Sequence, residues 1–132
     1  MKSIVLIAAL ALPAFAVPHP LDPLDAPELA KAVEVLKKSG KFKDGMLFPT
    51  LALNEPPKAE VLVWKPGDPY RREAFATLYD RSAGKTYEAV VDLNKSALAS
   101  WKALPGVQPP VLLSEFEELP KVVAADPRWQ KA

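Results

Sequence analysis

The chain has 132 residues, enough for about one domain, with one histidine, no cysteine and a formal net charge of +1. Without cysteine, and with a single histidine, it lacks the ligand sets of the common transition-metal sites and the usual nucleophile–base pairs. The balanced charge has no basic run, which argues against a nucleic-acid partner.

Residues 1–16 predict a signal peptide. Lys2 is followed by an almost unbroken apolar run, and Ala14-Phe15-Ala16 forms a small-residue cleavage site. The run is shorter than the roughly 20 residues that span a bilayer. The alternatives are an N-terminal anchor or a buried helix. We expect a secreted chain with no membrane contact after cleavage.

A helix is predicted to begin after the proline-rich residues 17–23. Asp25 is a suitable N-cap, and Glu28 stands three residues later, as in a capping box. One apolar face follows the helical spacing, through Leu29, Ala32, Val33 and Leu36. Gly40 is placed to end the helix in the left-handed conformation.

Four further segments predict strands, at residues 46–53, 72–80, 86–93 and 96–104. Pro49 requires the first to be an edge strand or to carry a bulge, because proline donates no ladder hydrogen bond. The second alternates between two faces, and a glycine-containing turn joins it to the third as a hairpin. A helix followed by antiparallel strands is typical of an α+β fold, with the helix across one face of the sheet.

Two interpretations fit residues 54–64. Val61 and Val63 alternate with their neighbours, as in a strand. The prolines after Asn54 instead favour a helix start, with Asn54 or Glu55 as cap and a proline at the first helical position.

A last helix is predicted after the break at residues 105–110. Ser114 and Glu117 suit a capping box, and an apolar face follows, through Phe116, Leu119, Val122 and Val123. Pro120 lies inside it, at a cost of roughly 3 kcal/mol, so we expect a kink or two short helices. Asp126-Pro127 should end it. This helix has no sheet of its own and predicts the start of an incomplete second unit.

Candidate functional side chains are few. We expect His19 to be an exposed residue of the N-terminal segment, and the three tryptophans to pack in the core or an interface, at Trp64, Trp101 and Trp129. An acidic cluster at the start of the last helix suits the helix dipole better than Ca²⁺, at Glu115, Glu117 and Glu118. Asn94-Lys95-Ser96 is a possible N-glycosylation sequon, and otherwise a turn.

Several motifs, in order and spacing, resemble the N-terminal region of copper-dependent primary amine oxidases. They are "HPLDPL", "NEPPKAEVLVW", "RREAFATLYDRSAGKTYEAVVDL", "SWKALPGVQPP" and "SEFEELPKVVAADPRWQKA", which extend over residues 19–132. The resemblance implies a cystatin-like N2 domain over residues 17–108, with one helix packed on a four-stranded antiparallel sheet. It implies the start of the N3 domain over residues 109–132, and a short helical connection at the Pro-Pro-Lys stretch of residues 56–58 that ends before Pro66.

The resemblance also implies a reaction for the whole family, the oxidative deamination of primary amines to aldehydes with hydrogen peroxide and ammonia. Its chemistry uses copper held by three histidines, an aspartate base and topaquinone made from the tyrosine of an Asn-Tyr-Asp/Glu motif. Tyr79 follows Leu78 and Tyr87 follows Thr86, so neither fits the motif. We therefore expect no catalytic, metal-binding or cofactor-binding residue in this chain.

Two functional hypotheses remain. The first is a non-catalytic N-terminal piece of a secreted oxidase, whose partners are the N3 and catalytic domains within the homodimer of the family. It predicts an exposed apolar patch around Phe116, Val122 and Trp129. The second is a freestanding secreted cystatin-like binding module with an ordered C-terminus. A protease inhibitor is a weak form of it, because "GVQP" at residues 106–109 is not the Gln-x-Val-x-Gly loop of those inhibitors.

Overall fold

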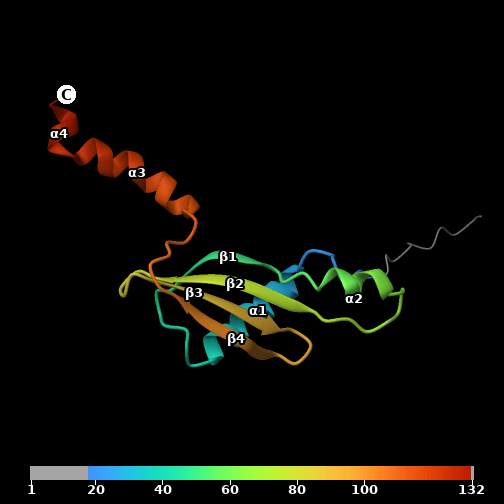
Figure 1. Cartoon of the computed structure of the whole chain (residues 1–132). Coiled ribbons are helices and arrows are strands. Elements are labelled where there is room, and N and C mark those ends of the chain that lie inside the picture. The colour runs from blue at the N-terminus through green and yellow to red at the C-terminus, as the bar shows by residue number, and fades with distance from the viewer. Residues whose placement is uncertain (1–17, 132) are drawn as a thin grey trace, which may run out of the picture.

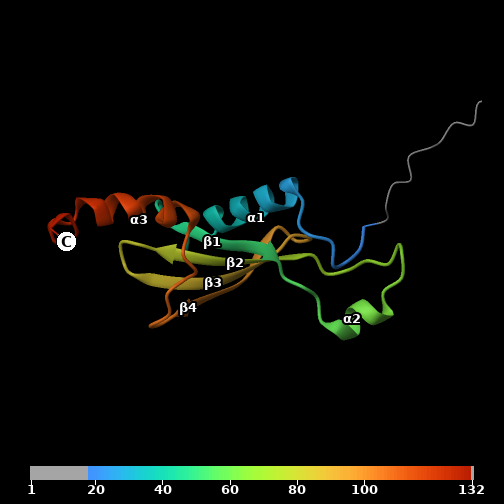
Figure 2. The ribbon, with the colours of Figure 1, turned by 90° about the horizontal axis from the view of Figure 1, so that it is seen from above.

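The computed structural model describes residues 18–131, so the predicted signal peptide at residues 1–16 lies outside the described residues. One helix covers one face of a four-stranded antiparallel sheet of order β1-β2-β3-β4 (Figures 1 and 2). This confirms the predicted α+β fold. The elements in chain order are α1 (Ala26–Lys38), β1 (Leu47–Leu53), α2 (Lys58–Val63), β2 (Glu73–Asp80), β3 (Lys85–Asp92), β4 (Ala97–Leu104), α3 (Leu113–Ala125) and α4 (Pro127–Gln130).

The capping box of α1 is present as predicted. The Asp25 carboxylate accepts the backbone N–H of Glu28 at 2.8 Å, and the Glu28 carboxylate accepts that of Asp25 at 3.0 Å. Gly40 follows the C-cap Ser39 with φ +72°, a conformation that glycine adopts without strain. Both ends of α1 are therefore determined by local sequence.

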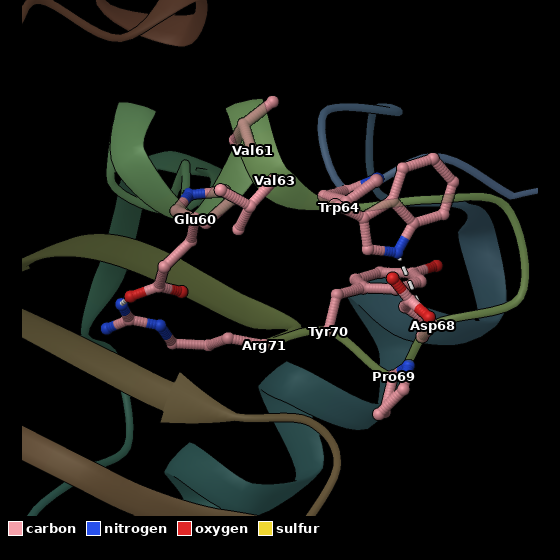
Figure 3. A pocket seen from close by; sticks show the side chains of 10 residues that line it. Glu60, Val61, Val63, Trp64, Asp68, Pro69, Tyr70 and Arg71 are labelled. Atoms are coloured by element: carbon pink, nitrogen blue, oxygen red, sulfur yellow. Dashed lines mark hydrogen bonds and ion pairs between the residues drawn. The ribbon is translucent and has the colours of Figure 1, made fainter.

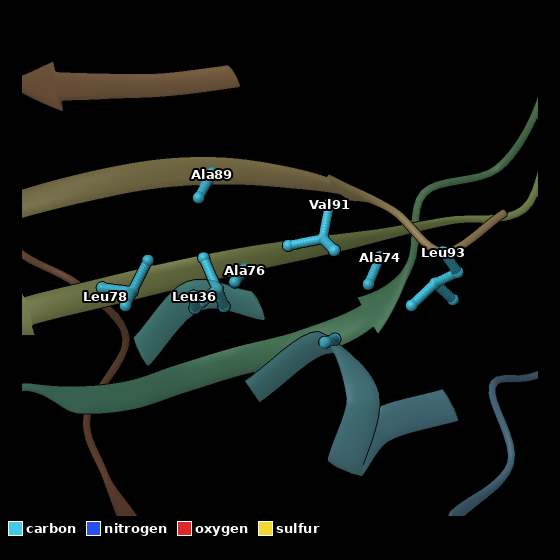
Figure 4. Packing of buried hydrophobic residues seen from close by; sticks show 8 residues of the cluster. Leu36, Ala74, Ala76, Leu78, Ala89, Val91 and Leu93 are labelled. Carbon is cyan, nitrogen blue, oxygen red and sulfur yellow. The ribbon is translucent and has the colours of Figure 1, made fainter. Parts of the chain in front are cut away.

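The core lies between α1 and the sheet (Figure 4). Its buried members are mostly small, so the helix can approach the strands closely; they are Ala32, Leu36, Ala74, Ala76, Leu78, Ala89, Val91 and Leu93. Ala74 pairs with Val91 and Ala76 with Ala89 across β2 and β3. The other face of β2 is half-buried, as its alternating sequence predicted.

Pro49 lies in an edge strand and beside a bulge. β1 pairs with β2 alone, and its register shifts between Leu47, opposite Tyr79, and Thr50, opposite Thr77. Both predicted alternatives, an edge strand and a bulge, are therefore present. On an edge strand the backbone N–H that proline lacks has no partner to bind, and the bulge bends the strand.

Residues 58–63 form a helix, α2, as the resemblance implied, but its predicted cap is wrong. Pro57 is the N-cap and makes no side-chain capping bond. Asn54 instead extends the pairing of β1 with β2. Its backbone N–H donates to the Glu73 carbonyl at 2.9 Å and its side-chain amide to the Glu73 carboxylate at 2.8 Å.

For α3, the predicted capping residues are wrong, and so is the alternative of two short helices. The helix begins at Leu113, and Glu115 rather than Glu117 reaches back, accepting the backbone N–H of Leu112 at 3.0 Å. Pro120 lies inside one continuous helix rather than between two short ones, and the alternative of a kink stays a prediction. It removes a single backbone bond on an exposed helix, where water can satisfy the carbonyl of Phe116.

The C-terminal helices extend beyond the end of the sheet, on the same side as α1 (Figures 1 and 2). Asp126 ends α3 as predicted and also caps α4, accepting the backbone N–H of Arg128 at 2.8 Å. The expected apolar patch is confirmed, because its large side chains are 57–76% exposed, at Leu113, Phe116, Leu119, Val122 and Trp129. No helix within residues 18–131 has the length and apolar character needed to cross a membrane.

The core predicts a sharp difference between two leucines. Leu36 is fully buried and Leu62 is 73% exposed. Leu36→Ala should lower the free energy of unfolding by about 2–5 kcal/mol, because it removes packed methyl groups and leaves a cavity. Leu62→Ala should cost less than about 0.5 kcal/mol. Urea unfolding followed by circular dichroism measures both, and equal losses would contradict this core.

Candidate functional site

A hollow of about 260 Å³ lies between the N-terminal segment, α2 and the loop before β2 (Figure 3). We call it the Trp64 pocket. Its apolar wall combines one residue of the N-terminal segment with several from residues 56–70, namely Pro20 with Pro56, Val61, Val63, Trp64 and Tyr70. Pro20 is fully buried. The prolines that punctuate the sequence therefore help to build a concave apolar surface.

Trp64 is held rigidly in this pocket. Its ring meets that of His19 edge to face at 5.0 Å and that of Tyr70 at 6.0 Å. Its indole N–H donates to the Asp68 carbonyl at 3.0 Å. His19 is therefore half-buried against Trp64, and the prediction of an exposed residue is wrong. No local pattern marks this contact, since the two residues are distant in sequence.

The charged residues of the pocket are already engaged. Glu60 forms an ion pair with Arg71, and their hydrogen bond raises the pKa of Arg71. The Asp68 carboxylate accepts the backbone N–H of Lys65 at 3.0 Å. Residues 18–131 hold no group of three or more His, Cys, Asp or Glu side chains that could bind a metal. The pocket suits the packing of an apolar group better than proton transfer.

Arg72 joins the start of β2 to the N-terminal segment and α1. It is 8% exposed, and its Nε and one terminal nitrogen each donate to the Glu28 carboxylate at 2.6 Å. It also donates to the carbonyls of Asp22, at 2.7 Å, and Pro23, at 2.9 Å. The hydrogen bond from Arg72 lowers the pKa of Glu28. The sequence identified Glu28 as a capping residue but gave no sign of this partner.

Asp80 closes the turn between β2 and β3. Its side chain is 5% exposed and accepts the Ser82 hydroxyl at 2.6 Å, the backbone N–H of Ala83 at 3.1 Å and the Lys43 ammonium at 3.2 Å. These bonds, the one from Ser82 foremost, lower the pKa of Asp80 to about 2. The sequence placed the turn but not the buried carboxylate that ties it to Lys43.

Asn94 lies in the exposed turn between β3 and β4, as predicted. Its side-chain amide donates to the Tyr70 carbonyl at 2.9 Å, so it also fixes the loop beside the Trp64 pocket. Its glycosylation stays a prediction. Glu115 pairs with Arg81 at 3.1 Å, whereas Glu117 and Glu118 are exposed.

The three tryptophans have different surroundings. Trp101 packs against the core and lies 5.2 Å from the ring of Tyr87, which confirms its predicted packing. Trp64 packs in its own pocket outside that core. Trp129 is 65% exposed, so core packing is wrong there and an interface role stays a prediction.

Residues 19–104 match the family described as "Copper amine oxidase, N2 domain". The chain belongs to the copper amine oxidase family. It is 40% identical over 112 residues to a primary amine oxidase of Arthrobacter sp. strain P1, a match that covers 84% of this chain and 17% of that enzyme. For a primary amine oxidase of Klebsiella aerogenes the identity is 33% over 107 residues, covering 80% of this chain and 14% of that enzyme.

The fold is shared with a solved structure of the family, a copper-containing benzylamine oxidase from Hansenula polymorpha. The TM-score is 0.73 at 20% identity, and the alignment covers 86% of this chain and 19% of that one. The N2 match contains the Trp64 pocket, Arg72 and Asp80. The predicted N3 start at residues 109–132 lies beyond that match and stays a prediction.

Removing the Arg72 side chain should destabilise the domain, because it deletes the hydrogen bonds that join the start of β2 to α1 and the N-terminal segment. Arg72→Ala leaves Glu28 and two carbonyls without their donor, so we expect a loss of about 2 kcal/mol in the free energy of unfolding. Arg71→Ala should cost far less, because the Arg71 side chain is 40% exposed and its ion pair is screened by water. Urea unfolding of both variants tests this difference. An unchanged free energy of unfolding in Arg72→Ala would contradict a stabilising role for these hydrogen bonds.

Asp80 predicts a specific acid sensitivity. Its folded pKa is about 2 against the ordinary value of 3.8, so as the pH falls through this window the unfolded state binds the proton first and stability is lost. Asp80→Asn should lower the Tm at pH 7. Between pH 4 and 2, the Tm of the variant should fall less steeply with pH than that of the unmodified protein. The Tm gap between the two proteins should therefore narrow with acid; a constant gap would refute the assignment.

Proposed function

We propose that the chain serves as a non-catalytic N-terminal domain of a larger secreted primary amine oxidase that uses copper and topaquinone. The observation that carries this is the N2 match over residues 19–104, in a chain that spans 17% of the Arthrobacter enzyme. The reaction of the whole enzyme would be the deamination of primary amines to aldehydes, with hydrogen peroxide and ammonia released.

The residues of this chain do not fit the cofactors of that reaction. The chain has one histidine, His19, whose ring packs on Trp64. Tyr79 and Tyr87 lie within β2 and β3 and lack the preceding asparagine that topaquinone formation needs. Copper and topaquinone would therefore be held by the rest of the oxidase.

The partners would be the N3 and catalytic domains, within a homodimer. The exposed apolar side of α3 supports this, because a 13-residue helix that buries none of its residues gains little stability alone. In this proposal α3 begins the N3 domain and is covered there. Residues 1–16 support secretion, and Asn94 would then be open to N-glycosylation.

A freestanding binding module is the second candidate. The observation in its favour is that the buried core draws on α1 and the sheet region and on no residue of α3. The N2 region therefore has a core of its own, and a module without the enzyme would be stable. The two candidates differ in one expectation: only a domain of an oxidase should be able to replace the matching region of an active oxidase.

A chimera tests the proposal. The 112 matching residues of a second Arthrobacter sp. strain P1 relative, a copper methylamine oxidase that is also 40% identical over this match, are replaced by those of this chain. With copper and methylamine, the chimera should release hydrogen peroxide, and the 132-residue chain alone should give no more than a boiled control.

Two results would overturn the proposal. Peroxide from the chain alone would show that it is itself catalytic. An insoluble or inactive chimera, beside an active parent enzyme prepared identically, would favour the freestanding module.

A further inference from the structure

We propose that α2 and the Trp64 pocket form the surface through which this domain docks on the body of the oxidase. The surface consists of Leu62, Val63, Trp64, Tyr70 and Arg71. The inference rests on the proposed function and specifies where the contact lies. It is separate from the covalent continuation through α3.

Two apolar side chains of α2, Leu62 and Val63, are largely exposed to solvent. Leu62 and Val63 are each 73% exposed, and no residue of α2 is buried. The helix has six residues and no side-chain cap at its N-terminus, so it has little stability of its own. A fold that keeps such a segment helical, with its leucine and valine in water, gains once a partner covers them.

The surroundings of α2 are fixed before any partner arrives. Trp64 is tied to Asp68, Asn94 holds the Tyr70 carbonyl, and Arg71 pairs with Glu60. Tryptophan, tyrosine and arginine are the residue types that contribute most at protein interfaces, and rigid anchors lose little entropy on binding. Figure 3 shows these side chains around the hollow, into which an aliphatic side chain of a partner would insert.

The charges around the pocket indicate a protein partner. Glu60 is paired with Arg71, and Asp68 lines the hollow near Tyr70, so both signs of charge occur around it. Lipid headgroups and nucleic acids select basic surfaces instead. An apolar centre with a mixed polar rim is the usual anatomy of a protein contact.

The body of the oxidase is the partner that the dimensions favour. The matched region is 17% of the Arthrobacter enzyme, so most of that chain lies outside it. In Figure 1, α2 and α3 lie at opposite ends of the sheet. A body several times larger than the domain can cover both ends at once, and two separated contacts would fix the orientation of the domain.

Hydrogen exchange measures the contact directly. Amides of residues 58–65 should exchange at least about 10-fold more slowly in the chimera than in the isolated chain, because docking suppresses local opening of α2. Equal rates in a folded, active chimera would overturn the inference while leaving the proposed function intact. A chimera that does not fold would instead count against the proposed function. Slow exchange in the isolated chain together with a dimeric mass would assign the surface to a second copy and also overturn it.

Two matched double variants separate docking from helix propensity. Leu62→Ser with Val63→Ser should return the exchange of α2 in the chimera to the rate in the isolated chain. Lys58→Ser with Ala59→Ser changes the same helix at exposed positions outside the proposed surface, and should preserve the protection. Neither pair should shift the Tm of the isolated chain by more than about 2 °C, since all four side chains are exposed. Loss of protection in both pairs would contradict docking through Leu62 and Val63.

Discussion

The contact between Arg72 and Glu28 fixes how the parts of this domain meet. One guanidinium binds the carboxylate at the start of α1 and two carbonyls of the N-terminal segment, and Arg72 itself immediately precedes β2. Because Glu28 also completes the capping box, the same carboxylate starts the helix and attaches it to the sheet. The N-terminal segment is thereby attached to the start of β2, in a chain path where His19 meets the ring of Trp64 and Pro20 lines the pocket.

The sequence predicted most of the fold because the local signals agree with the tertiary structure. The cap at Asp25, the glycine at the end of α1 and the period-two alternation of β2 act over a few residues, and packing does not oppose them. Pro49 was also informative, because a residue without a backbone N–H can occupy only an edge strand or a bulge in a sheet. The resemblance to the oxidases then resolved α2, which the local pattern left open.

What the sequence missed lies in long-range contacts and in exposed helices. Arg72 and Glu28 are 44 residues apart, and no spacing rule relates them. The edge-to-face contact of His19 with Trp64 likewise depends on the path of the N-terminal segment. At Asn54, pairing with Glu73 outcompeted a helix cap. At Pro120, water around the exposed α3 can satisfy the carbonyl that loses its donor, so the helix does not divide in two. In each case the outcome depends on a distant residue or on solvent exposure, which the local sequence pattern does not specify.

The lowered pKa values of Glu28 and Asp80 accompany contacts that hold the domain together. Strongly perturbed pKa values often mark active sites, because catalysis needs groups tuned away from their ordinary range. Here the lowered values of Glu28 and Asp80 arise from bonds that join α1 to β2 and close a turn onto Lys43. Neither carboxylate lines the Trp64 pocket. These two carboxylate contacts are therefore separate from the concave surface, whose own charge contact is the Glu60–Arg71 ion pair, and that separation is what the proposed role in binding and positioning would require.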